Sequence, residues 1–143
     1  MIDFDNRTTL EVDISLSQNI ADSLTKKDIE LILTDSSEMR EINKTHRSID
    51  KDTDVLSFPY EDVFMAPLGS IVISSAYVKE KSKEFGHSQN EEFTLLFIHG
   101  LLHLLGYDHE VDNGEMREME AELIEKFHLP KSLIVRTNDL ADL

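Results

Sequence analysis

The sequence predicts a single α+β domain: a small, mixed, four-stranded sheet, a central buried helix, and further helices around it. Strand-type and helix-type apolar patterns alternate along the chain. Residues 93–105 are apolar on nearly all sides, which is typical of a helix inside a core. The 143 residues are 40% hydrophobic and contain no Gly/Ser/Pro-rich linker, so we expect residues 1–143 to form one domain.

The first part of the chain alternates between strand and helix. Residues 1–13 contain a weak period-2 pattern that fits a first strand, and residues 17–24 fit a short helix. Residues 28–34 alternate more clearly, as a largely buried strand does. Ser36 is the predicted N-cap of a second helix that ends near His46.

The middle of the chain predicts two strands separated by a loop. Residues 45–54 are polar and lack periodicity, so they are expected to form a loop. Residues 55–58 form a short strand that Pro59 closes, and residues 60–68 form a second loop. Residues 69–74 contain three successive β-branched apolar side chains, which indicates a strand buried on both faces.

The last third of the chain is predicted to be helical. Residues 75–85 fit a helix that Gly86 ends. Ser88 and Glu91 have the spacing of a capping box, which marks the start of the apolar helix over residues 93–105.

A final helix is expected after that apolar helix. Asp112 and Glu115 repeat the capping pattern, and Pro130 stops the helix. We expect residues 131–143 to be only partly ordered. The final helix carries an apolar stripe of Met116, Met119, Leu123 and Phe127.

Charge and composition limit the partners of the chain. The formal net charge of −15 argues against nonspecific binding to nucleic acid, and we expect no DNA partner. A cluster of basic residues could present a basic lip to an RNA, and an ordinary solvated face is the alternative interpretation. The cluster contains Arg40, Lys44, Arg47 and Lys51. There is no cysteine, so a metal must be held by His, Asp or Glu. No signal peptide is visible and the longest apolar run is shorter than the roughly 20 residues of a membrane span, so we expect a cytoplasmic protein without a membrane partner.

Three histidines recur at a spacing that one metal ion can gather. His99 and His103 are i and i+4 on the predicted apolar helix and therefore share a face. Gly106 offers a helix stop, after which the chain can turn back and bring His109 to the same point. Three protein ligands with an open fourth position are typical of a catalytic zinc site.

Other interpretations of these histidines are weaker. Two hydrogen-bonded core histidines and an unrelated third would leave two buried imidazoles without a nearby carboxylate in sequence. The spacing also matches metzincin proteases, but these carry a glutamate base where this chain has Gly100. His46, His87 and His128 are expected to be surface or loop residues.

The stretch from His99 to His109 reads His-Gly-Leu-Leu-His-Leu-Leu-Gly-Tyr-Asp-His, and it resembles the signature of the bacterial YbeY family almost letter for letter. That family consists of single-zinc endoribonucleases of ribosomal RNA maturation. Over about residues 28–127, further matches are Asn43, Arg47, Thr53-Asp-Val-Leu-Ser-Phe-Pro59, Leu68-Gly69, Ile71-Val-Ile73, Met119 and Glu120. The chain departs from the family at Ser70, where an aspartate is usual.

The resemblance implies roles for four residues. His99, His103 and His109 would hold one zinc ion per chain, and Arg47 matches the family's functionally important arginine. Zinc lowers the pKa of bound water from 15.7 to about 7 and polarises phosphoryl oxygens. An arginine presents a planar fork that fits phosphate oxygens. The general acid and base stay open, and Asp108 could orient a histidine or cap the turn.

The resemblance also implies a function. The protein would be a single-strand-specific, zinc-dependent endoribonuclease that matures the 3′ end of small-subunit ribosomal RNA and acts in late ribosome quality control. Its partners would be single-stranded RNA, ribosomal RNA and the ribosomal small subunit. The alternatives are a ribosome-assembly factor with a mainly structural zinc, or another zinc hydrolase such as a peptidase. Water and the substrate 2′-hydroxyl both remain possible nucleophiles.

Overall fold

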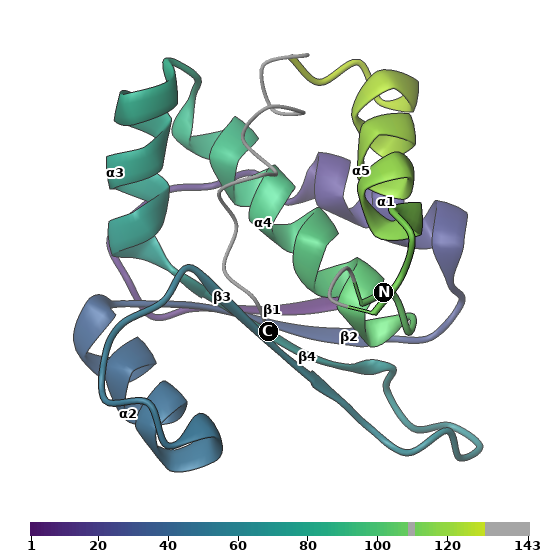
Figure 1. The fold of residues 1–143 in the computed structure, drawn as a ribbon, viewed down its shortest axis with the longest axis horizontal. Helices are drawn as coiled ribbons and strands as arrows, with labels where there is room; N and C mark the ends of the chain where they lie inside the picture. Colours follow the sequence, from purple (N-terminus) through teal and green to yellow (C-terminus); the bar gives the residue numbers. More distant parts are fainter. Residues whose placement is uncertain (109–110, 131–143) are drawn as a thin grey trace.

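A four-stranded mixed sheet with helices on both faces forms the described part of the protein, residues 1–108 and 111–130 of a computed structural model. The strands are β1 (Ile2–Asn6), β2 (Ile29–Thr34), β3 (Val55–Pro59) and β4 (Gly69–Ser74). The helices are α1 (Ser15–Leu24), α2 (Ser36–Arg47), α3 (Ser75–Phe85), α4 (Gln89–Leu104) and α5 (Glu115–Lys126). The predicted α+β class is confirmed (Figure 1). Both His109 and the tail 131–143 lie outside the described residues.

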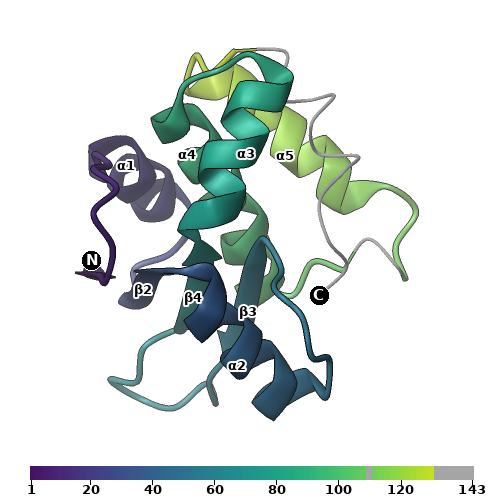
Figure 2. The same cartoon turned by 90° about the vertical axis from the view of Figure 1, so that its left-hand side faces the viewer.

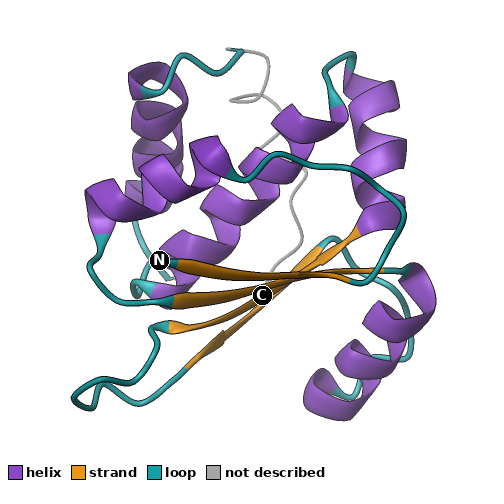
Figure 3. Cartoon of the chain, turned by 180° about the vertical axis from the view of Figure 1, so that it is seen from behind, coloured by secondary structure: helices purple, strands orange, loops and turns teal. Residues whose placement is uncertain are grey.

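The sheet has the strand order β1-β2-β4-β3. Strands β1, β2 and β4 are parallel, while β3 is an antiparallel edge strand. Helices α1, α3, α4 and α5 lie on one side of the sheet and α2 lies alone on the other, as seen in Figures 1 and 3. The chain therefore forms three layers, and β4 has both of its faces covered.

Two apolar clusters hold these layers together. The larger one lies between the sheet and the four-helix side and includes most of α4. The smaller one contains Met39, Leu56 and Val72, between α2 and the opposite face of the sheet. Every residue of β4 is buried, as its continuous apolar run predicted.

Helix α4 is the centre of the four-helix side, where it contacts α1, α3, α5, β3 and β4 (Figure 2). The predicted capping box is present, because Ser88 Oγ accepts from Glu91 N at 3.0 Å and Ser88 N donates to Glu91 Oε1 at 2.8 Å. At the other end Gly106 has φ +101°, and the following Tyr107 N donates to Leu102 O at 3.0 Å. This glycine-dependent turn ends the helix as predicted.

Two helix starts differ from the prediction. The N-cap of α2 is Asp35, not Ser36, because the Asp35 carboxylate accepts from Glu38 N at 2.8 Å. Helix α5 begins at Glu115, and Asp112 supports it by accepting from Met116 N at 2.9 Å. Helix α2 also extends to Arg47, so the predicted loop after it is shorter. None of the helices in the described ranges is long and apolar enough to cross a membrane.

Candidate metal centre

The first two predicted metal ligands, His99 and His103, lie side by side on α4. Their ring centroids are 4.8 Å apart and the rings are inclined at 77°. The i, i+4 spacing produces this arrangement, because it places both side chains on one face of the helix. His99 is 1% exposed, and the Nε2 atoms of both rings are buried.

A carboxylate that sequence reasoning did not assign to the site contacts the first of these rings. Glu120 Oε1 on α5 lies 3.2 Å from His99 Nδ1, and both side chains are 2% exposed. Met116, Glu120 and Leu123 are all buried on α5. A charged residue on the apolar face that a helix turns to the core was the signal in the sequence that could have pointed to Glu120.

The two imidazoles fit a zinc ion. They present buried Nε2 nitrogens from neighbouring turns of one helix, and neutral imidazole nitrogen is a preferred zinc ligand. A carboxylate against the second nitrogen of a histidine is the usual outer partner of a metal-binding ring. Within residues 1–108 and 111–130 no group of three metal-binding side chains is found, and the third predicted ligand, His109, lies outside those ranges.

Gly100, which lies between the two histidines, is a point of close approach between α4 and the sheet. Ser57 Oγ of β3 donates a hydrogen bond to Gly100 O at 3.0 Å. A Cβ atom on Gly100 would stand 2.8 Å from Ile71 Cγ2 of β4 and 3.1 Å from Ser57 Oγ. The glutamate base of a metzincin protease has no space at this position, which argues against a peptidase.

Arg47 is half-buried at the last position of α2, on the opposite side of the sheet from α4. The following segment, residues 48–54, leads from α2 to the edge strand β3, which contacts α4. This segment is held by Asn43 Nδ2, which donates to Lys51 O at 2.9 Å, and by the Arg40–Asp50 ion pair at 2.7 Å. The chain after Arg47 therefore leads from α2 into β3, the edge strand that packs against α4.

Asp52 in the same segment has a perturbed carboxyl group. Burial raises its pKa above the ordinary value, and the negative charges of Asp54 and Asp35 act in the same direction. Hydrogen bonds from Thr53 N at 2.9 Å and Ser74 Oγ at 3.3 Å oppose the shift only in part. A carboxyl whose pKa is higher in the folded state opposes folding at any pH above that pKa.

The substitution Asp52→Asn is therefore expected to raise the free energy of unfolding near neutral pH. Because the protonated carboxyl and the amide are both uncharged, the difference between the proteins should shrink as the pH falls through the folded pKa of Asp52. Urea unfolding followed by circular dichroism at a series of pH values measures this. A variant that is less stable than the natural protein near neutral pH would contradict the expectation.

Ser70, where the chain departs from the family pattern, does not face the histidines. A Cβ on Gly69 would meet Leu104 of α4, and Ile71 packs against Gly100. Side chains alternate along a strand, so Ser70 points to the opposite side, the one that α2 covers. The position at which the family usually has an aspartate therefore lies on the other face of the sheet from His99 and His103.

Asp108 and the histidines outside the predicted ligand set lie as follows. Asp108 is in the turn after α4, where its carbonyl oxygen accepts from Asp112 N at 3.2 Å. His46 is exposed and packs on Phe58 with ring centroids 4.9 Å apart, and His128 is exposed as expected.

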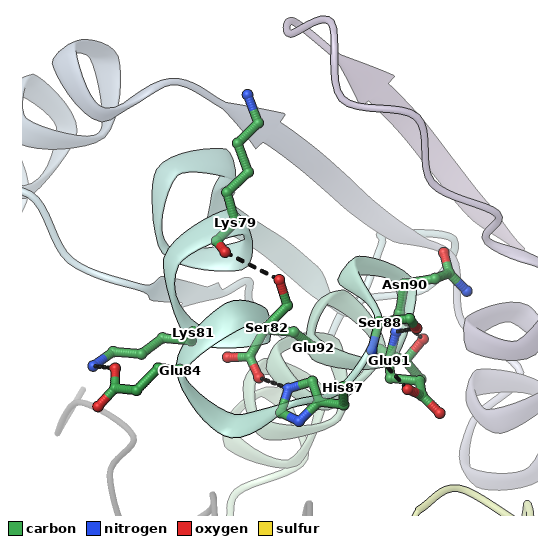
Figure 4. Close-up of polar contacts among 10 residues, drawn as sticks. Lys79, Lys81, Ser82, Glu84, His87, Ser88, Asn90, Glu91 and Glu92 are labelled. Carbon is green, nitrogen blue, oxygen red and sulfur yellow. Dashed lines mark hydrogen bonds and ion pairs between the residues drawn. The ribbon is translucent and has the colours of Figure 1, made fainter.

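His87 lies in a loop, as predicted, yet its side chain is not at the surface. The ring is 2% exposed, and Nε2 lies 2.7 Å from Glu92 Oε2 on a fully buried carboxylate (Figure 4). The loop between α3 and α4 is short, so its histidine packs inward against the first turns of α4. The prediction of a surface or loop residue is therefore confirmed for the loop, while the side chain itself is buried.

An α+β domain whose central helix carries two adjacent imidazoles with buried Nε2 atoms, one ring in contact with a carboxylate, defines a protein with a candidate metal centre. The sequence model of a protein family, described as endoribonuclease YbeY, matches residues 4–128 of this chain. The chain belongs to this family.

Curated relatives agree over nearly the whole chain. The endoribonuclease YbeY of Sulfurimonas denitrificans is 69% identical over 137 residues, covering 96% of this chain and 99% of the relative. That of Aliarcobacter butzleri is 64% identical over 140 residues, covering 96% of this chain and 100% of the relative. The solution structure of TM1509 from Thermotoga maritima has a TM-score of 0.61 at 29% identity and covers 89% of both chains.

Proposed function

We propose that the protein is a cytoplasmic, zinc-dependent endoribonuclease that cleaves single-stranded RNA during ribosomal RNA maturation at the 3′ end of the small-subunit RNA. The observation that carries the proposal is the imidazole pair on α4, His99 and His103, in a chain that belongs to the endoribonuclease YbeY family. The ribosomal small subunit is the proposed partner, and quality control of assembled ribosomes is a further proposed role.

Each proposed site residue has a role that suits its chemistry. His99, His103 and His109 hold the metal, and Arg47 binds the phosphate at the cleaved bond through two parallel hydrogen bonds. When bound, zinc supplies Lewis acidity toward a phosphoryl oxygen and water with a lowered pKa. The burial of both Nε2 atoms favours this chemistry, because electrostatic interactions are stronger away from bulk water.

The charge distribution supports a single-stranded substrate. Arg47 lies in the basic last turn of α2 with Lys44 and His46, whereas α5 begins with two acids, Glu115 and Glu118. A strand whose bases are unstacked can bring one phosphate to a partly buried centre, which a rigid duplex cannot do. The acidic remainder of the surface repels RNA that is not bound at the basic lip.

The substitution Arg47→Ala is expected to lower kcat/KM for a single-stranded RNA about 100-fold, the cost of removing one preorganised charged donor. Arg47→Lys should recover only part of the loss, because lysine lacks the fork that binds two oxygens. Gel analysis of cleavage of an end-labelled oligoribonucleotide measures both effects.

Arg117→Ala removes an exposed arginine of α5 and is the matched control for net charge. It is expected to cleave as the natural protein does. Equal cleavage by the natural protein, Arg47→Ala and Arg117→Ala would reveal a contaminating nuclease and reject the proposed activity.

A further inference from the structure

Glu120 is the one acid of α5 that points into the core beside the candidate metal centre. Its exposed fraction is 2%, and Oε1 lies 3.2 Å from His99 Nδ1. The second oxygen, Oε2, is buried and makes no hydrogen bond within the described residues. Its neighbours on the same helix face, Met116 and Ile124, are fully buried apolar side chains, so the carboxylate occupies a position where an apolar residue would be expected.

We propose that Glu120 is a positioning residue that holds His99 ready to bind the metal. A carboxylate against Nδ1 accepts a hydrogen bond from that nitrogen, so the hydrogen of the neutral ring resides there and Nε2 presents its lone pair. The contact also fixes the rotation of the ring, so that Nε2 keeps one direction. This inference rests on the proposed metal site and names a residue outside its three histidines.

The buried charge gives a second argument for this role. A carboxylate shielded from water is costly unless a positive charge or several donors compensate it. At Glu120 one oxygen has the imidazole and the other has no donor in the described chain. A divalent cation held by His99 would supply the missing positive charge, so the carboxylate and the metal would stabilise each other.

A second buried histidine–glutamate pair, His87 and Glu92, provides an internal comparison. Glu92 of α4 is fully buried and its Oε2 lies 2.7 Å from His87 Nε2, at the end of the helix near α3 (Figure 4). His87 is not part of the predicted ligand set. Both pairs consist of a histidine and a glutamate with buried side chains, but only His99 is a predicted metal ligand. Replacing the glutamate of each pair by glutamine therefore distinguishes an effect on a metal ligand from an effect on the stability of the fold.

The experiment measures zinc affinity by competition with a chromophoric chelator for the natural protein, Glu120→Gln and Glu92→Gln, each prepared free of metal and shown to be folded by circular dichroism. The substitution Glu120→Gln is expected to weaken zinc binding about 10- to 100-fold, the usual effect of removing the outer partner of a metal-binding histidine. Glu92→Gln is expected to leave zinc affinity unchanged, whatever it does to stability. Glu120→Asp retains the carboxylate one methylene further from His99 and should restore part of the zinc affinity. If Glu120→Gln does not fold, Glu120→Asp takes its place in the measurement.

Three outcomes would overturn the inference. They are unchanged zinc affinity in Glu120→Gln, an equal loss of affinity in Glu92→Gln, and an affinity of Glu120→Asp no better than that of Glu120→Gln. A natural protein that binds zinc and shows the expected differences, yet cleaves no single-stranded RNA, would contradict the proposed function and leave the role of Glu120 supported.

Discussion

Replacing His103 with alanine is expected to remove stoichiometric zinc binding and to lower cleavage of single-stranded RNA at least about 1,000-fold. The reason is that a bound metal supplies several kcal/mol of transition-state stabilisation, and each 1.4 kcal/mol corresponds to a factor of ten in rate. His103 shares one face of α4 with His99 at a ring separation of 4.8 Å, so its loss removes half of the described imidazole pair. Metal analysis by mass spectrometry and the cleavage assay are carried out on the same preparations.

His128→Asn is the matched control for this prediction. His128 is exposed and has φ +58°, a backbone conformation that asparagine tolerates better than most residues. This variant should contain one zinc per chain and cleave RNA at the natural rate. A His103→Ala protein that retains one zinc per chain, or that cleaves RNA as fast as the control, would contradict both the ligand assignment and the metal-dependent mechanism.

Local sequence patterns predicted much of the fold because they determine much of its local geometry. Helix α4 begins at the capping box of Ser88 and Glu91 and ends before Gly106, as the sequence predicted. The i, i+4 spacing of His99 and His103 was enough to place the two rings together, because both lie on one rigid helix. Interactions within one element were therefore predictable.

Contacts between elements were not predictable in the same way. Glu120 is 21 residues from His99 in sequence and meets it only because α5 packs against α4. His87 is buried because the short α3–α4 connection turns it toward Glu92, and a loop assignment carries no information about that direction. The N-cap Asp35 was missed because it adjoins Ser36, which is an equally good capping residue.

Substitution of Gly100 is expected to destabilise the protein by an amount that rises steeply with side-chain size. Gly100→Ala gains about 1 kcal/mol of helix propensity but places a methyl group 2.8 Å from Ile71 Cγ2, and such overpacking costs about 1–3 kcal/mol. Gly100→Glu adds an unpaired carboxylate to the same buried interface, so its total cost should exceed about 4 kcal/mol, a large share of the stability of a typical domain. Urea unfolding of the metal-free proteins measures both.

A double-mutant cycle tests whether the contact with β4 is the cause. In an Ile71→Ala background the nearest atom to the new methyl group is gone, so the cost of Gly100→Ala should fall or reverse as helix propensity takes over. An unchanged cost in that background would contradict the steric explanation. If the explanation holds, the residue after the first histidine is set by the approach of α4 to the sheet, and a glutamate base of the protease type cannot be introduced there without moving the helix that carries the histidines.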